Sequence, residues 1–225
     1  MGLRVLLGAI ASAVALMAWG LLFWVVLGGV LGGPRALPEE AALMDALARR
    51  IGASGTYVFP APPGPERGQG SAVQGGAVQG AAGEAAAMEA FRRVQMAGPT
   101  GVLHLNRAGF DPLAPRQHAL AFAQVFAASL VAALLLLALR ESLETYSQRA
   151  MFVLALGVFA ALAVRLYDPV WWHLPWRHFL RGALYDVTAW LVAGMVLAAI
   201  VRPGRGAQHL TDPSKPLWKR ALEAD

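Results

Sequence analysis

The feature that most constrains this chain is a set of four long apolar runs. The first, Val5 to Gly33, contains Ser12 as its only polar residue, and the others cover residues 119–139, 149–166 and 183–201. A helix needs roughly 20 residues to cross the ~30 Å hydrocarbon core of a bilayer. Charged residues make up only 15% of the chain, whereas about 25% is usual in soluble domains. The sequence therefore predicts a mainly α-helical membrane protein with four transmembrane helices.

The first run predicts an uncleaved anchor over residues 1–33. A signal peptide has a shorter apolar core followed by a small-residue cleavage site, whereas this run continues through Trp19 and Trp24. The uncharged part of the third run, Ala150 to Val164, is short for a span. We expect its helix to extend at both ends, with Arg149 and Arg165 reaching opposite membrane surfaces.

Basic residues set the expected orientation. Arg4 precedes the first run, Arg140 and Arg149 lie in the link between the second and third, and five lysines and arginines follow Val201. Positively charged segments tend to stay in the cytoplasm, which predicts that both termini are inside, including a basic tail over 202–225. Because arginine and alanine are abundant, as is typical of GC-rich bacterial genomes, we expect the bacterial inner membrane.

Residues 34–118 then form a periplasmic α+β domain. A helix is expected from Pro38, because proline and the acids Glu39 and Glu40 suit a helix N-terminus. Strands are expected over 56–59 and 101–106 and a second helix over 84–96. The Gly/Gln/Ala-rich insert 62–83 has too few apolar residues to fold and is predicted to be disordered. So small a core is marginal by itself, and we expect it to lean on the membrane or on a partner.

The segment WWHLPWRHFLR, residues 171–181, lies between the third and fourth runs. Pro169, just before this segment, and Pro175 within it predict a turn followed by a short interfacial helix within 167–182, and tryptophans concentrate at membrane interfaces. The alternative is a pocket for a quinone, a lipid headgroup or a partner. The candidate binding residues for that alternative are Arg165, Asp168, Trp171, Trp172, His173, Trp176, Arg177, Arg181 and Asp186.

Asp186 is the most informative acid, because it begins the fourth run. We expect it to pair with an arginine such as Arg165 or Arg181, or to belong to a polar site on the outer face. Gln124 and Ser129 in the second run are predicted to hydrogen-bond across helices. Small residues such as Gly157 and Ala161 allow close helix approach, although such pairs arise easily in a chain rich in alanine and glycine.

The sequence also excludes several chemistries. It contains no cysteine, which rules out disulfides and thiol catalysis. His173 and His178 are five residues apart, which does not place them on one helical face, so no metal site is predicted. We find no nucleotide-binding or hydrolase motif, no catalytic residues and no cofactor site. No compact basic patch with interleaved aromatics appears, which argues against nucleic acid.

Several short stretches carry a resemblance to a known group. In order they are WG before FWVVL, PEEAALMDAL, GTYVFP, GPTGVLHLN, and DPVWWHLPW before DVTAWLVAGMVLA. They resemble hypothetical small bacterial integral membrane proteins with four spans and one periplasmic domain. The resemblance covers most of the chain except the Gly/Gln-rich insert, and the glycines after Leu27 depart from the tryptophan–histidine pair expected there. It implies four spans and the external domain, and it implies no activity.

Together these patterns favour a non-enzymatic inner-membrane protein that acts as an accessory or interaction subunit through its outer face. The alternative is a lipid- or small-molecule-binding membrane protein, or a transporter subunit, with a pocket near 165–186 at the outer interface. The expected partners are the lipid bilayer and either another membrane protein or a second copy of the chain.

Overall fold

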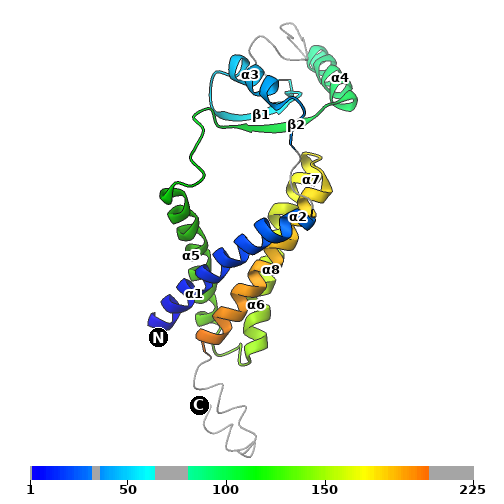
Figure 1. Ribbon diagram of the computed structural model, residues 1–225. Helices are drawn as coiled ribbons and strands as arrows, with labels where there is room; N and C mark the ends of the chain where they lie inside the picture. Colours follow the sequence, from blue (N-terminus) through cyan, green and yellow to red (C-terminus); the bar gives the residue numbers. More distant parts are fainter. Residues whose placement is uncertain (1, 32–35, 64–80, 203–225) are drawn as a thin grey trace, which may run out of the picture. The chain divides into compact units, whose positions relative to one another are not determined.

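The computed structural model describes residues 2–31, 36–63 and 81–202. The chain forms two compact units, which are described separately below (Figure 1). The helical unit comprises Met1–Pro34, Asp111–Pro169 and Pro175–Asp225. The α/β unit comprises Arg35–Phe110 and Val170–Leu174. The expected disordered insert and basic tail lie largely outside the described residues, at 64–80 and 203–225.

Within the described residues, four continuous helical stretches are long and apolar enough to cross a membrane: Gly2–Leu31, Pro115–Ala138, Tyr146–Trp171 and Trp176–Ile200. The protein is therefore mainly helical and compatible with a multi-pass membrane protein, as the four apolar runs predicted. The first stretch is not one uniform α-helix, and neither is the third. Each contains a π-helical segment, in which the backbone hydrogen bonds span one residue more than in an α-helix.

The elements of these stretches follow the chain. The first stretch consists of α1 (Gly2–Leu21), the π-helix η1 (Leu22–Leu27) and α2 (Gly28–Leu31), and the second is α5 (Pro115–Ala138). The third consists of α6 (Tyr146–Ala160), the π-helix η2 (Ala161–Arg165) and α7 (Tyr167–Trp171), and the fourth is α8 (Trp176–Ile200).

The helices extend further than the apolar runs, and this corrects the prediction for 167–182. That segment is not a turn followed by a separate interfacial helix. Instead, α7 continues the third stretch as far as Trp171, and α8 begins at Trp176 and runs unbroken into the fourth. Pro175 serves as the N-cap of α8, where its missing N–H costs nothing. Pro169 has no N–H for the carbonyl of Arg165, the residue at which the π-helical segment ends.

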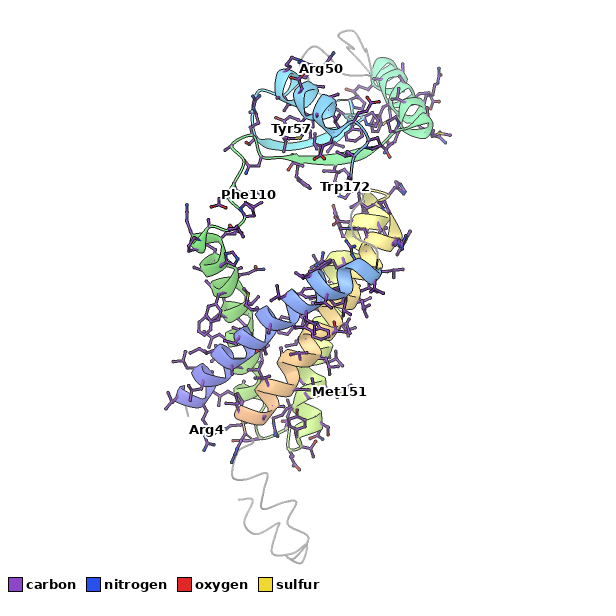
Figure 2. All side chains as sticks on the ribbon, in the orientation of Figure 1. Arg4, Arg50, Tyr57, Phe110, Met151 and Trp172 are labelled. Carbon is purple, nitrogen blue, oxygen red and sulfur yellow. The ribbon has the colours of Figure 1, made fainter. Side chains whose placement is uncertain are left out.

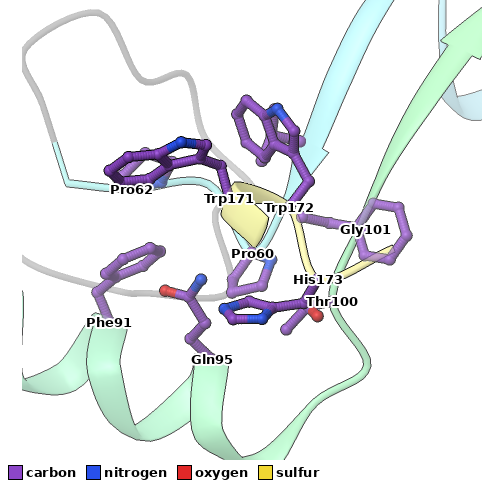
Figure 3. Close-up of a pocket in the computed structure, with 11 residues that line it drawn as sticks. Pro60, Pro62, Phe91, Gln95, Thr100, Gly101, Trp171, Trp172 and His173 are labelled. Carbon is purple, nitrogen blue, oxygen red and sulfur yellow. The ribbon is translucent and has the colours of Figure 1, made fainter. Parts of the chain in front are cut away.

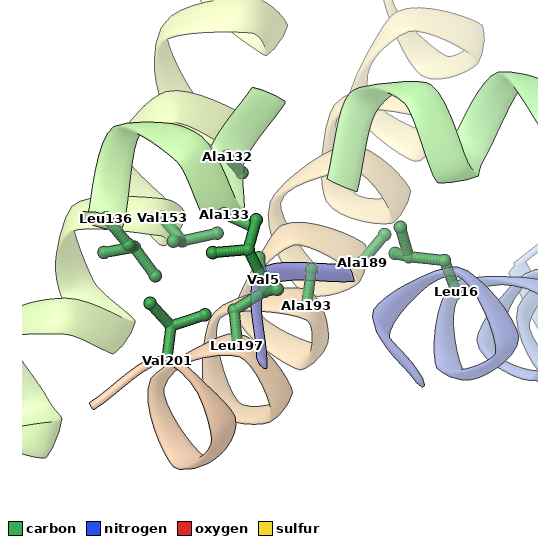
Figure 4. Close-up of a cluster of buried hydrophobic side chains, with 10 residues drawn as sticks. All are labelled: Val5, Leu16, Ala132, Ala133, Leu136, Val153, Ala189, Ala193, Leu197 and Val201. Carbon is green, nitrogen blue, oxygen red and sulfur yellow. The ribbon is translucent and has the colours of Figure 1, made fainter. Parts of the chain in front are cut away.

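The core of the helical unit is built from small and branched side chains. Helix α1 packs against α5 and α8, and α6 packs against α8. The buried cluster between them (Figure 4) consists of Val5, Leu16, Ala132, Ala133, Leu136, Val153, Ala189, Ala193, Leu197 and Val201. Alanine and glycine at these contacts let the helix backbones approach closely. In a membrane the lipid tails are as apolar as the side chains, so helices associate through close van der Waals packing of this kind.

Two glycines mark the closest approach, between α6 and α8. A Cβ on Gly157 of α6 would lie 2.3 Å from Trp190 Cβ, and a Cβ on Gly194 of α8 would lie 2.7 Å from the Ala150 carbonyl oxygen. Both positions therefore need glycine for packing, and Ala161 is buried as well. In the sequence alone the Gly157/Ala161 pair is only a weak indication of such a contact, because alanine and glycine are abundant in this chain.

Two buried serines inside the bundle pair with each other. Ser129 Oγ donates a hydrogen bond of 3.0 Å to Ser12 Oγ, and both side chains are fully buried between α5 and α1. This confirms the predicted role of Ser129, whereas Gln124 is exposed on α5.

Arg149 differs from its prediction. It does not extend to a surface but turns inward, with its guanidinium donating to the carbonyls of Ala198, Leu143 and Glu144. The last turn of α8 leaves carbonyls without helical partners, and Arg149 supplies donors to one of them.

The part of the α/β unit that the structure describes forms two helices and a two-stranded sheet. Strand β1 (Gly55–Phe59) pairs antiparallel with β2 (Gly101–Leu105), so that Thr56 lies opposite His104 and Phe59 opposite Gly101. Helices α3 (Glu40–Arg50) and α4 (Ala81–Ala97) both lie on one side of the sheet in Figure 1. The predicted elements are present with small shifts. Helix α3 starts after Glu39, whose backbone is left-handed (φ 51°), and α4 starts at Ala81, inside the expected insert.

Candidate functional site

The structure divides the predicted site residues into two groups. Arg165, Arg181 and Asp186 belong to the helical unit, where they form what we call the ion-pair cluster together with aromatic side chains of the first helical stretch. Trp171, Trp172 and His173 belong to the α/β unit, where they line a hollow that we call the loop pocket. The remaining three predicted residues belong to neither group.

The centre of the ion-pair cluster is a two-point contact between η2 and α8. Arg165 donates from Nε to Asp186 Oδ2 at 2.7 Å and from Nη2 to Asp186 Oδ1 at 3.2 Å. A Cβ on Gly182 would lie 3.3 Å from Arg165 Nη1, so the small residue makes room for the guanidinium. Asp186 thus pairs with one of the two arginines that the sequence offered. Parallel N–H···O bonds of this kind fix both position and orientation.

Arg181 has a different environment. Its side chain is only 8% exposed, and its guanidinium carbon lies 5.2 Å from the ring centroid of Trp24. A cation over an aromatic face is attracted by the ring's quadrupole, more strongly where water is excluded. Trp24 in turn contacts Phe23 and Tyr185, at centroid distances of 5.2 and 5.3 Å. The first helical stretch therefore supplies an aromatic wall to the cluster.

The sequence pattern does not predict this aromatic wall, because it places Trp19, Phe23 and Trp24 only in an apolar anchor. In the structure, Trp19 Nε1 donates to Thr188 Oγ1 at 3.1 Å and Phe23 is almost fully buried. The four-residue spacing of Trp19 and Phe23, which places both on one helical face, was the available signal. The rings are contributed partly by η1 and the guanidinium of Arg165 by η2, and π-helical segments occur frequently at functional sites.

The loop pocket is lined by four segments of the α/β unit: the end of β1, the middle of α4, the start of β2 and the loop after α7 (Figure 3). Its volume is about 80 Å³. Its walls are mainly rings, contributed by Phe59, Pro60, Pro62, Phe91, Trp171 and Trp172. Polar groups come from Gln95, Thr100 and His173. None of the described residues that line it is an acid, a lysine or an arginine.

Backbone features shape this pocket. His173 has φ 53°, in the left-handed region that non-glycine residues adopt at a cost. Its ring lies beside the Gln95 amide and Thr100 in Figure 3. On the sheet, the Phe59 ring covers Gly101, where a Cβ would lie 2.7 Å from Phe59 Cζ. The sequence offered Trp171, Trp172 and His173 as binding residues but not Phe91 and Gln95, whose four-residue spacing on the predicted second helix was the signal.

The other predicted residues lie outside both groups. Asp168 is exposed in α7, Arg177 is exposed in the first turn of α8, and the Trp176 ring packs edge-on to Phe179 at 5.7 Å. Within the described part of the chain, no group of three histidine, cysteine or acidic side chains is placed to hold a metal ion. The ion-pair cluster offers charge and ring surfaces, and the loop pocket offers ring surfaces and neutral polar groups. Both sets of groups are suited to binding a ligand or a partner.

Comparisons with protein-family models, with curated proteins and with solved structures found no match for this chain.

Proposed function

We propose that this protein is a non-enzymatic multi-pass protein of the bacterial inner membrane that acts as an interaction subunit through its α/β unit. The distribution of basic residues supports an orientation with both termini in the cytoplasm. In that orientation the α/β unit is periplasmic, and the four helices serve to anchor it.

The observation that carries this proposal is the exposed apolar surface of the α/β unit. Among its described side chains only Pro60 is buried. In contrast, the exposed fraction is 57% for Met44, 76% for Met96 and 74% for Phe110 (Phe110 is labelled in Figure 2). Exposed apolar side chains on a water-facing module are available for a partner to cover, and large exposed apolar patches mark interaction sites of this kind. The two helices and two short strands described in this unit also bury too little surface to be robust alone, so a partner would add stability as well as specificity.

A second candidate function is recognition of an anionic lipid headgroup or small molecule at the ion-pair cluster. It is favoured by the side chain of Arg165. Its Nε and Nη2 both bind Asp186, yet 41% of the side chain remains exposed. A bound anion would add a second acceptor for this guanidinium. This candidate competes with the first only if no protein partner is found.

The test is gentle extraction from native membranes followed by native mass spectrometry of the assembly. We expect a protein partner in fixed stoichiometry. The variant Met44→Gln/Met96→Gln keeps side-chain length but adds polarity, and it should lose that partner. The control variant Glu84→Gln, also exposed on α4, should retain it. A chain that carries only a fixed non-protein mass, or a partner equally retained by both variants, would contradict the proposal.

A further inference from the structure

We propose that the loop pocket binds a neutral, extended peptide segment of the partner through a proline ring. This inference rests on the proposed function, because it names the chemistry of the partner that the α/β unit engages. It is argued from the size of the pocket, its walls, its polar groups and its backbone.

Size and walls favour one compact ring. A volume of about 80 Å³ is well below the 300–1,000 Å³ that is common for pockets of drug-sized ligands. Trp171, Trp172 and Phe91 line the pocket with apolar rings from two separate segments. Grooves lined by aromatic side chains are the usual recognition surface for proline-rich segments, whose preformed extended helix loses little entropy on binding. The protein's own Pro60 and Pro62 already line the same hollow, so proline rings are compatible with these walls.

The polar groups favour a peptide backbone beside that ring. Gln95 carries both a donor and an acceptor, and His173 and Thr100 add further polar atoms at the same side of the pocket (Figure 3). A peptide carbonyl and N–H are neutral groups that match this set. Because none of the described lining residues is an acid, a lysine or an arginine, a charged headgroup or a charged side chain would lose its hydration without gaining a countercharge.

The backbone indicates that the pocket is preformed. His173 is held at φ 53° between Trp172 and Leu174, and strained residues of this kind persist where the surrounding structure over-determines them. The two prolines and the Phe59 ring on Gly101 stiffen the other wall. A stiff site and a stiff ligand both reduce the entropy lost on association.

The experiment uses the full chain in nanodiscs with 5-fluorotryptophan at its seven tryptophans. Fluorine NMR signals are assigned with single Trp→Phe variants, and the probe is an end-blocked oligoproline peptide. We expect saturable shifts of the Trp171 and Trp172 signals, and none for Trp190, which packs against Gly157 in the helical unit. An end-blocked glycine–serine peptide of the same length should cause no shift. The variant Gln95→Leu should bind oligoproline roughly three- to tenfold more weakly, since it loses one neutral hydrogen bond.

A second variant separates loss of binding from loss of folding. His173→Gly keeps the left-handed backbone and removes the imidazole, so it should fold and should also bind more weakly. No shift of the Trp171 and Trp172 signals, equal shifts with both peptides, or shifts produced only by lipid headgroups would overturn the inference. If shifts are absent while the native partner is still retained, the pocket assignment fails and the proposed function stands. If saturable shifts appear but no native partner is found, the pocket assignment stands and the proposed function fails.

Discussion

The contact between α6 and α8 makes a quantitative prediction at Gly157. Replacing this glycine with alanine would place the new Cβ 2.3, 2.5 and 2.8 Å from Trp190 Cβ, Cγ and Cδ1. Carbon atoms in contact are normally about 3.5–4.0 Å apart. The nearest atom is a Cβ, whose position is fixed by the backbone of α8, so the indole cannot rotate away from the clash. The two helices must separate by about 1 Å or more.

The magnitude follows from two opposing effects. Overpacking of a well-packed contact costs about 1–3 kcal/mol, and a clash with a backbone-fixed atom belongs at the upper end of that range. Alanine gains up to about 1 kcal/mol over glycine in a helix interior. The net expectation for Gly157→Ala is a loss of about 2 kcal/mol in the free energy of unfolding, roughly a thirtyfold change in the folding equilibrium.

The assay is reversible unfolding in bicelles by added SDS, followed by far-UV circular dichroism and tryptophan fluorescence. The matched control is Gly29→Ala in α2, where an added Cβ meets nothing within 4 Å. That variant should be as stable as the wild type or more stable by up to about 1 kcal/mol. If Gly157→Ala is as stable as Gly29→Ala, the two helices are not as close as the structure places them, and the reasoning is refuted.

A double variant tests the same contact from the other helix. Gly194→Ala would place a Cβ 2.7 Å from the Ala150 carbonyl oxygen, so it should also destabilise. Both substitutions push the same pair of helices apart. We therefore expect Gly157→Ala/Gly194→Ala to cost less than the sum of the two single variants, whereas sites that act independently would be additive.

Three further predictions use the same unfolding measurement. Ser129→Ala removes the buried bond to Ser12 and should cost about 0.6–1.7 kcal/mol, and adding Ser12→Ala should cost little more unless the bond is absent. Arg149→Met keeps the length of the side chain but removes its donors to three carbonyls, so a loss of about 1–3 kcal/mol is expected, and an unchanged stability would contradict the inward placement. Asp186→Asn should cost about 1–2 kcal/mol, less than for a fully buried pair because the Arg165 side chain is 41% exposed, and Arg165→Gln/Asp186→Asn should recover part of that loss.

The existence of the four helices could be predicted because hydropathy is a property summed over about 20 residues. The ends of the helices could not. The prolines at 169 and 175 predict a break by local rules, but Pro175 caps the start of α8 and Pro169 lies within α7, next to the π-helical η2. A proline can end one helix or begin the next, and the local sequence does not distinguish the two cases here. The apolar pattern on either side of these prolines is too weak to decide.

The candidate site was half predictable for a different reason. Arg165 and Asp186 stand out because charges are costly in apolar runs, so their pairing could be anticipated. Trp24 could not be anticipated as the partner of Arg181, because a tryptophan in an anchor is equally well explained by the membrane interface. Arg149 was placed wrongly for a related reason. The carbonyl of Ala198 that attracts it belongs to another helix, and no local rule gives that neighbour.

The two units differ in what stabilises them, and this difference bears on function. In the helical unit, buried alanines, glycines and paired serines let the helices pack closely against one another. In the α/β unit, the described side chains leave methionine and phenylalanine exposed and bury only Pro60. Any partner that binds the folded α/β unit and not its unfolded form stabilises it by mass action. If the proposed partner binds in this way, folding of the α/β unit and recognition of the partner would be one linked equilibrium, and a small module with a marginal core would gain both stability and specificity from a single contact.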